Sequence, residues 1–439
     1  MEIPKLETQR WEEILGSNHW EGLLEPLDLN LRQLILRCGD FCQATYDSFD
    51  GDKHSKYCGS CRYGKKSFFK KVALESAAND YFVDSFLYAT SPVVKSIFSF
   101  SYSKEAWDRE SNWIGYIAVS TDEASERLGR REIYVAWRGT IRTLEWMNVF
   151  DPEKASVKPL LKPQNHNTKT NATEEHTTEH RHWYDILICK QNDDTDANEE
   201  EDIPQVMKGW LTIYNSDNPN SQFTKLSART QVLSKIRRLA TMYKDENVSV
   251  LLTGHSLGAS LAILCAFDLV ENGLSKVPVT AIVFGSPQIG DKAFSDKLAT
   301  FTNLRILHVK NTIDLIPLYP SKLLGFSDTG TELEVDTRKS TSLKDSKNPS
   351  DWHNLQAILH IVAGWNGKQK EFELKVDRNV ALVNKSCDYL KDDQLVPASW
   401  WVEKNKGMVL EDGKWAMAPP DEEDIPVPEC EDIIVPACY

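Results

Sequence analysis

The sequence predicts an α/β fold in which helices cover a mostly parallel sheet. Short runs of β-branched and apolar residues recur along the chain, and a helical pattern or a turn separates each run from the next. One run, "VSVLL" at 248–252, leads through "TGHSLGAS" into a stretch whose apolar residues have helical spacing. This passage indicates a buried strand that turns sharply into a helix at Ser256.

The predicted elements follow one another along the chain. Residues 6–48 have the pattern of helices, with Pro26 separating them. The predicted strands after them are 113–120, 131–140, 248–253, 279–285 and 304–310. We therefore expect a single domain over residues 1–420.

Two segments differ in character from this domain. Residues from about 151 to 202 are rich in Asn, Thr, His and Glu, and seven of the twelve residues at 191–202 are acidic. The last residues, 421–439, are acidic and rich in proline. We expect a mobile acidic insertion in the first case and a tail in the second.

Charge and hydropathy exclude several classes of partner. The net charge of −14 argues against nucleic acid and against electrostatic adhesion to anionic membranes, so any lipid contact would be hydrophobic and peripheral. No run reaches the roughly 18 apolar residues of a spanning helix, and the first residues lack the pattern of a leader. We expect a soluble, cytoplasmic protein.

The cysteine pattern allows a zinc site but favours buried thiols. Nine cysteines is an odd count that suits reduced thiols better than a disulfide framework. Cys38, Cys42, Cys58 and Cys61 have C-x3-C and C-x2-C spacings that can hold zinc. Because Cys38 and Cys42 also fit the apolar stripe of a helix, we interpret them as core residues.

The motif Gly254-His255-Ser256-Leu257-Gly258 has the form G-x-S-x-G. A tight turn from strand to helix presents the serine in a strained backbone conformation, and small residues on both sides let strand and helix pass closely. The serine hydroxyl then lies at the carboxyl end of the sheet, beside a helix N-terminus that favours negative charge. We predict that Ser256 is a nucleophile.

A nucleophilic serine needs a base and an orienting carboxylate, in the chain order Ser, Asp or Glu, His. Asp314 follows the strand predicted at 304–310, and His353 lies near the start of a later helical run. His360 is a rival base, since it lies seven residues on and nearly on the same helical face. His353 is preferred because it is closer to a loop.

Other titratable residues near predicted strand ends receive different interpretations. Asp291 and Asp328 are rivals of Asp314, but neither follows a strand as closely. His308 within a strand and His255 within the turn are interpreted as structural.

Ester hydrolysis also needs two donors for the developing oxyanion. The backbone N–H of Leu257, directly after the nucleophile, is one candidate. The other is Thr140, because "AWRGT" ends a strong strand with Gly139-Thr140.

Several of these motifs together resemble one known family. "AWRGT", "GHSLGAS", "FGSPQIGD", "NTIDLIP" and "DWHNLQAILHIVAGW" occur in the order found in the class 3 lipases. The run "VNKSCDYLKDDQLVPASWWVEKNKGMVLEDGKWAMAPP" is similar to the plant cytosolic phospholipase A1 group of type II. The resemblance implies an α/β-hydrolase fold and hydrolysis of the sn-1 acyl ester of glycerophospholipids at a lipid–water interface, without a metal or cofactor. It also implies a triad and an oxyanion hole made of Ser256, Asp314, His353, Thr140 and Leu257.

The same resemblance places a lipase lid after Thr140. The segment carries a large apolar load, which a soluble protein normally buries, so exposure on contact with lipid is a hypothesis. An ordinary amphipathic helix on the body is the alternative. The lid residues predicted to meet substrate are Ile141, Leu144, Trp146 and Met147.

Two other functions remain open from the sequence. The same mechanism could act on monoacylglycerol, diacylglycerol or galactolipid. A catalytically silent, lipase-like scaffold that binds a partner is the second alternative, although such proteins commonly lose a triad member and all three residues are present here.

Overall fold

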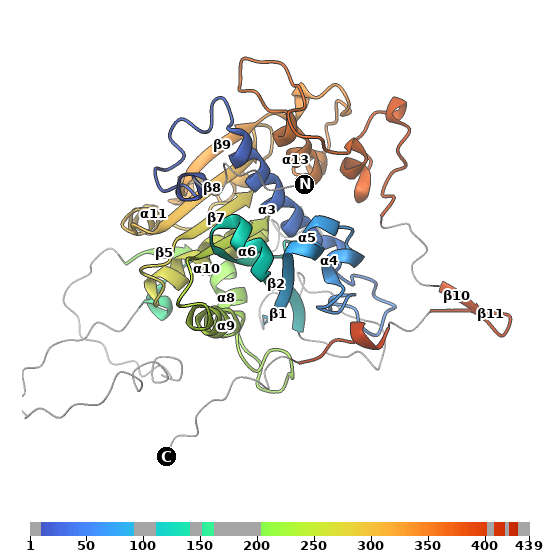
Figure 1. Cartoon of the computed structure of the whole chain (residues 1–439), viewed down its shortest axis with the longest axis horizontal. Coiled ribbons are helices and arrows are strands. Elements are labelled where there is room, and N and C mark those ends of the chain that lie inside the picture. Colours follow the sequence, from blue (N-terminus) through green and yellow to red (C-terminus); the bar gives the residue numbers. More distant parts are fainter. Residues whose placement is uncertain are drawn as a thin grey trace, which may run out of the picture.

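One seven-stranded sheet forms the centre of the structure (Figure 1). The computed structural model describes residues 10–91, 111–140, 152–161, 203–401, 408–417 and 421–428. The strands of the sheet, in spatial order, are β1 (Tyr81–Thr90), β2 (Ser111–Ser120), β3 (Arg131–Trp137), β6 (Val248–His255), β7 (Val279–Phe284), β8 (Leu304–Asn311) and β9 (Thr331–Val335).

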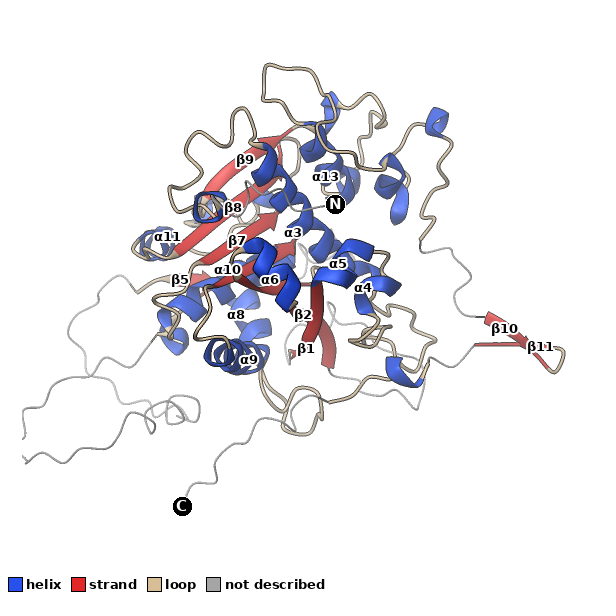
Figure 2. Cartoon of the chain, viewed as in Figure 1, coloured by secondary structure: helices blue, strands red, loops and turns tan. Residues whose placement is uncertain are grey.

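Five neighbouring strands of this sheet, β3 to β9, run parallel, and β2 pairs antiparallel with both β1 and β3. The prediction of a mostly parallel sheet flanked by helices is therefore confirmed (Figure 2). All five predicted strands are present, whereas β1 and β9 were not predicted. β3 ends at Trp137, so residues 138–140 lie in the loop after it.

Helices cover both faces of the sheet (Figures 1 and 2). One face packs against α3 and α13, and the other against α8, α9, α10 and α11. The helices are α2 (Trp11–Ile14), α3 (Leu29–Asp47), α4 (Phe68–Lys71), α5 (Glu75–Asp80), α6 (Asp122–Leu128), α8 (Lys208–Asn215), α9 (Ala228–Met242), α10 (Leu257–Glu271), α11 (Lys292–Ala299), α12 (Pro349–Trp352) and α13 (Leu355–Gly364).

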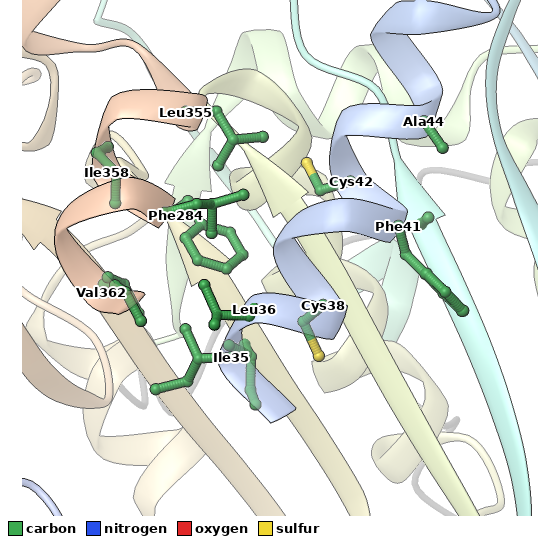
Figure 3. Close-up of a cluster of buried hydrophobic side chains, with 14 of the residues drawn as sticks. Ile35, Leu36, Cys38, Phe41, Cys42, Ala44, Phe284, Leu355, Ile358 and Val362 are labelled. Atoms are coloured by element: carbon green, nitrogen blue, oxygen red, sulfur yellow. The ribbon is translucent and has the colours of Figure 1, made fainter. Parts of the chain in front are cut away.

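The alternation of side chains along the strands gives each face its own core. On β6, Leu251 belongs to the α3 side, while Val250 and Leu252 belong to the α10 side. Figure 3 shows side chains of α3 and α13 gathered around Phe284 at the end of β7. The core thus reaches the carboxyl edge of the sheet.

α3 confirms the predicted amphipathic helix and its thiols. It begins after Asp28, whose carboxylate accepts hydrogen bonds from the backbone N–H groups of Asn30 and Leu31. Cys38 and Cys42 are fully buried in the core that this helix shares with α13 (Figure 3). Burial raises the pKa of the Cys38 thiol to about 12. Both side chains therefore belong to the packing of α3.

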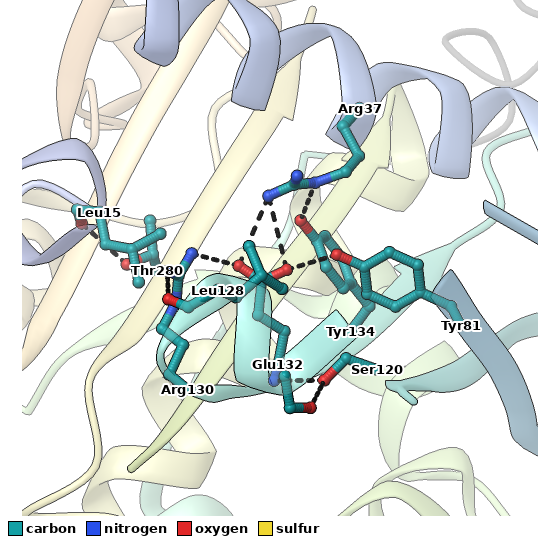
Figure 4. A network of polar contacts seen from close by, with 10 residues as sticks. Leu15, Arg37, Tyr81, Ser120, Leu128, Arg130, Glu132, Tyr134 and Thr280 are labelled. Atoms are coloured by element: carbon teal, nitrogen blue, oxygen red, sulfur yellow. Dashed lines mark hydrogen bonds and ion pairs between the residues drawn. The ribbon is translucent and has the colours of Figure 1, made fainter. Parts of the chain in front are cut away.

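A buried polar network lies near the start of β3 (Figure 4). This is the end of the sheet opposite to the one where β6 and β7 end at His255 and Phe284. Glu132 of β3 is fully buried and makes ion pairs with Arg130 and Arg37. The Tyr81 hydroxyl donates to the same carboxylate at 2.6 Å. Although burial alone would raise the pKa of Glu132, the two guanidinium groups hold it below its usual value.

The acidic insertion begins in an ordered segment. β4 (Lys154–Ser156) pairs with β5 (Gln205–Met207), and the 3₁₀ turn Lys158–Leu160 follows it. Val157 and Leu160 are fully buried in the core. Residues 152–161 therefore differ from the prediction of a mobile insertion, because apolar side chains attach them to the body; residues 162–202 lie outside the described part.

The predicted tail also begins in contact with the body. The Asp424 carboxylate accepts hydrogen bonds from the backbone N–H of Gly64 and from Lys71 Nζ, both at 2.6 Å. Residues 421–428 are therefore held by a charged contact, and the hairpin of β10 (Met408–Glu411) and β11 (Lys414–Met417) precedes them. In the described part of the chain, no helix is both long and apolar enough to cross a bilayer.

Candidate active site

Ser256 occupies a strained turn between β6 and α10. Its φ of 58° and ψ of −130° lie outside the regions that non-glycine residues normally adopt. A Cβ on Gly254 would lie 2.2 Å from the carbonyl oxygen of Gly258, and a Cβ on Gly258 would lie 2.4 Å from that of Trp137. Gly254 is therefore required by the close passage of β6 and α10 that the motif predicts, and Gly258 by the close approach of α10 to the end of β3.

Asp314 and His353 form a close, buried pair. His353 Nδ1 lies 2.5 Å from Asp314 Oδ2, and the other carboxylate oxygen accepts the backbone N–H of Ile316 at 2.9 Å. Asp314 lies in the loop after β8, and His353 lies between α12 and α13. Because the carboxylate accepts at Nδ1, that nitrogen carries the proton and Nε2 presents a lone pair.

The two atoms between which a proton would pass are both unpaired. Ser256 Oγ and His353 Nε2 are buried, and neither has a hydrogen-bond partner within the described residues. The residue before the serine connects the two segments, since His255 Nε2 lies 2.9 Å from the backbone oxygen of His353. The rings of these two histidines lie 4.4 Å apart between centroids. The turn and the His353 loop are thus in direct contact.

The end of β7 holds the same three groups together. The backbone N–H of Ser256 donates to the carbonyl of Phe284 at 3.1 Å. Gly285, with a φ of +52°, is so close to the pair that a Cβ would lie 2.8 Å from His353 Cε1 and 3.1 Å from Asp314 Oδ2. Any larger residue at Gly285 would therefore displace the pair.

The loop after β3 lies against the turn at Ser256. A Cβ on Gly139 would lie 2.5 Å from the carbonyl oxygen of His255, so the loop passes very close to the turn at this point. Thr140 is the next residue of the loop. Thr140 is buried, and its hydroxyl has no hydrogen-bond partner in the described part of the chain. Leu257 begins α10, and the first N–H groups of a helix have no partner within the helix. Both predicted donors therefore lie on segments that border Ser256.

Arg138 holds this loop from behind. Its guanidinium donates to the carbonyl oxygens of Trp113 at 3.0 Å and Gly139 at 2.9 Å, and it lies 3.8 Å from the centre of the Phe49 ring. The side chain is fully buried, and burial lowers its pKa to about 10. Arg138 thereby fixes the carbonyl immediately before Thr140.

The structure separates His353 from its rival base. His360 Nε2 lies 2.8 Å from the Ser340 hydroxyl, and its ring packs against Phe372. Burial, with a smaller effect from Arg378, lowers the pKa of His360 to about 4. His360, on α13, therefore contacts Ser340 and Phe372 and no carboxylate of the candidate site.

The rival carboxylates and histidines have structural contacts of their own. Asp291 caps α11 by accepting the N–H of Phe294, and Asp328 pairs with Lys322. His308 Nε2 accepts the backbone N–H of Ser286 at 2.9 Å, and burial lowers the pKa of His308 to about 3. These residues position the surroundings of the pair rather than replacing it.

Not every predicted residue can be placed. Ile141, Leu144, Trp146 and Met147, the predicted lid, lie outside the described residues, and the lid stays a prediction.

No group of three or more potential metal ligands was found in the part of the chain that is described.

Known proteins resemble this chain over almost its whole length. The family model for class 3 lipases matches residues 134–324. Phospholipase A1-IIdelta of Arabidopsis thaliana is 56% identical over 423 residues, which cover 95% of this chain and 98% of that protein. The chain belongs to the class 3 lipase family. Phospholipase A1-II 5 of Oryza sativa subsp. indica is 51% identical, covering 95% of this chain and 84% of that protein. Within the family, the chain falls in the plant phospholipase A1-II group.

Solved lipase structures resemble this class 3 lipase only distantly. A Rhizomucor miehei lipase in complex with its propeptide has 16% sequence identity and a TM-score of 0.37, covering 67% of each chain. The fold assignment therefore rests on the strand order and on the family.

Two residues of this class 3 lipase were missed as site residues from the sequence. Tyr46 of α3 places its hydroxyl 2.9 Å from His255 Nδ1, although more than 200 residues separate them in the chain. No local pattern indicates that contact. Gly285 could have been found, because it directly follows a buried strand at the edge where Ser256 and Asp314 also lie.

Proposed function

We propose that the chain is a serine-dependent acylhydrolase that releases the fatty acid from the sn-1 position of glycerophospholipids. In this proposal Ser256 is the nucleophile, His353 is the general base and acid, and Asp314 orients the imidazole. Membership of the class 3 lipases makes the chain a carboxylic ester hydrolase. The names of its relatives, phospholipase A1-II, support the phospholipid substrate and the sn-1 position.

A single observation carries the assignment of roles. Asp314 saturates one nitrogen of His353 at 2.5 Å, while His353 Nε2 and Ser256 Oγ remain buried and unpaired in the described structure. Buried polar atoms are normally satisfied, so two unpaired ones in adjoining segments indicate atoms that wait for a reaction partner. Hydrogen bonds between catalytic groups are often incomplete before substrate binds.

The proposed reaction proceeds through an acyl-enzyme. Ser256 Oγ bonds to the carbonyl carbon of the ester as His353 Nε2 takes the hydroxyl proton. The carbonyl oxygen becomes an oxyanion facing the N–H of Leu257 and the Thr140 loop. The intermediate then expels the glycerol oxygen, which takes the proton from Nε2 and leaves as lysophospholipid. Water repeats the sequence on the acyl-enzyme, and the fatty acid leaves while Ser256 recovers its proton.

Replacing Ser256 by alanine tests the nucleophile. We expect Ser256→Ala to lower kcat by about 10⁴-fold or more and to abolish labelling by a fluorophosphonate. Ser260→Ala is the matched control, since Ser260 is also buried in α10 with an unpaired hydroxyl but lies one turn farther on. Retained hydrolysis in Ser256→Ala contradicts the assignment of the nucleophile. If the wild-type chain hydrolyses no ester and takes no label, the alternative of a catalytically silent scaffold is supported instead.

Substrate and position are tested with defined lipids. Phosphatidylcholine with different fatty acids at sn-1 and sn-2 is expected to release the sn-1 acid. Release of the sn-2 acid contradicts the proposed position. If monoacylglycerol, diacylglycerol or galactolipid is hydrolysed faster than phosphatidylcholine, the mechanism stays the same and that lipid is the preferred substrate.

We also propose that the chain acts in the cytoplasm. The six cysteines in the described residues carry free thiols, which suits a reducing compartment. A fluorescent fusion of the full chain, followed through cell fractionation, tests this location.

A further inference from the structure

Four leucines directly after the catalytic carboxylate are exposed to solvent. Between Asp314 and Gly325, Leu323 is 97% exposed, Leu318 is 62% exposed, and Leu315 and Leu324 are each about half exposed. These four side chains, the leucine surface, come from a segment of only ten residues. A concentration of exposed apolar side chains beside a site usually marks a surface that contacts another molecule.

The fold holds these leucines in fixed positions. Leu318 lies in the 3₁₀ turn Ile316–Leu318, which Leu315 precedes, and Leu323 and Leu324 lie in the 3₁₀ turn Lys322–Leu324. Leu315 and Leu318 share a face because residues three apart eclipse in a 3₁₀ helix. The buried side chain of Ile316 anchors the first turn. The Ser321 hydroxyl accepts the N–H of Leu323 at 3.0 Å in the second. The exposure is therefore a property of an ordered segment.

The first turn is also tied to the catalytic pair. Asp314 Oδ1 accepts the N–H of Ile316 at 2.9 Å, while Oδ2 contacts His353. The backbone N–H of Gln288, in the loop after β7, donates to the carbonyl of Tyr319 at 2.8 Å. The leucine surface is thus held next to the candidate active site.

Charge distinguishes among the surfaces that the leucines fit. Lys322 is the only charged residue at 315–324, and it forms an ion pair with Asp328. The leucine surface itself carries no charge, and of its neighbours Lys322 is paired with Asp328 while Lys154 Nζ donates to the carbonyl of Gly325 at 3.4 Å. The net charge of −14 opposes an anionic bilayer. An electroneutral lipid surface matches both properties.

The residue types favour lipid over a protein partner. Protein interfaces obtain most of their affinity from Trp, Tyr and Arg, and leucine is under-represented among their hot spots. The four side chains of the leucine surface are purely aliphatic, which suits acyl chains. We propose that the leucine surface docks this protein onto an electroneutral phospholipid surface and so brings the site at Asp314 to its substrate. This inference rests on the proposed function for its purpose, but docking can be measured without catalysis.

Flotation with phosphatidylcholine vesicles tests the docking. The full chain carrying Ser256→Ala is expected to float with the vesicles, in high salt as in low salt. Adding Leu318→Ser and Leu323→Ser is expected to lower the partition coefficient at least about tenfold, because each substitution removes an inserted apolar side chain. Leu395→Ser is the matched control, since Leu395 is 89% exposed but lies outside the leucine surface.

Kinetics on the active chain separate docking from folding and chemistry. Leu318→Ser with Leu323→Ser is expected to raise KM for phosphatidylcholine vesicles about tenfold and to leave hydrolysis of a soluble short-chain ester unchanged. Unchanged flotation of the double variant, equal loss in Leu395→Ser, or flotation that requires anionic lipid overturns the proposal. If the vesicles bind but no phospholipid is hydrolysed, the docking stands and the proposed function fails.

Discussion

His255 is a buried imidazole whose two nitrogens join three parts of the fold. Burial, together with the neighbouring His353, lowers the pKa of His255 well below its usual value, so the ring is neutral. The backbone oxygen of His353 can only accept, so His255 Nε2 carries the proton and donates to it. Nδ1 must then accept from the Tyr46 hydroxyl. The Tyr46 hydroxyl therefore satisfies the buried Nδ1 of the tautomer that the His353 carbonyl selects.

Removing the Tyr46 hydroxyl is expected to affect chemistry more than folding. In Tyr46→Phe the buried Nδ1 of His255 loses its donor, and we expect kcat to fall roughly tenfold with little change in KM. Tyr116→Phe is the matched control, because Tyr116 donates a buried hydrogen bond at 2.9 Å to Phe41 of the same helix, away from the site. A kcat loss of equal size in both variants would show that Tyr46 acts only through stability.

At the scale of elements, β3 serves stability and the site at its two ends. Near its start, Glu132 is buried among Arg130, Arg37 and Tyr81 (Figure 4). Beyond its last residue, Arg138 fixes the loop that carries Thr140. β3 therefore has a buried charge network near its start and a loop of the candidate site beyond its end.

Glu132→Gln is expected to lower the free energy of unfolding by about 3 kcal/mol at neutral pH, because it removes the counter-charge of the buried Arg130 guanidinium. Urea unfolding at pH 7 measures the change. Glu246→Gln is the comparison, since Glu246 pairs with Arg131 of the same strand at 2.9 Å but is exposed, and we expect a loss below about 1 kcal/mol. Equal losses in the two variants contradict the special role of the buried pair.

At the scale of the whole molecule, three buried histidines make the fold sensitive to acid. Burial lowers the pKa of His308 to about 3 and of His360 to about 4, and it lowers the pKa of His255 well below its usual value. Below the unfolded pKa of about 6.5, the unfolded chain binds protons that the native state does not. The free energy of unfolding must therefore fall as pH decreases through this range.

The three imidazoles together set the slope of this loss. We expect about 4 kcal/mol per pH unit near pH 5, since each contributes about 1.4 kcal/mol per unit. Urea unfolding between pH 7 and pH 5 measures the slope, and His308→Gln is expected to reduce it by about one third. A slope that does not respond to this variant contradicts the assignment of His308 as a buried neutral group.

The parts of the site that are readable from sequence are those fixed by local geometry. The turn at Ser256 needs Gly254 and Gly258 within two residues, and Asp314 follows its strand directly. β9 was missed because it is a short edge strand with only two of its five residues buried. β1 is also an edge strand, but eight of its ten residues are buried, so its apolar pattern was readable from the sequence.

The choice between His353 and His360 shows where local reasoning ends. Seven residues separate them, which is nearly two helical turns, so one pattern places both on the same face. Only the contact with Asp314 at 2.5 Å decides between them.

By itself, the sequence determined the α/β class, the tight turn at Ser256 and the order of the candidate triad, because periodicity and tight turns depend on residues close together in the chain. The tertiary structure alone decided which imidazole meets the carboxylate, that the Tyr46 hydroxyl meets the buried Nδ1 of His255, and that leucines next to Asp314 stay exposed. Those outcomes depend on contacts between segments distant in the chain, which packing fixes and local pattern does not encode.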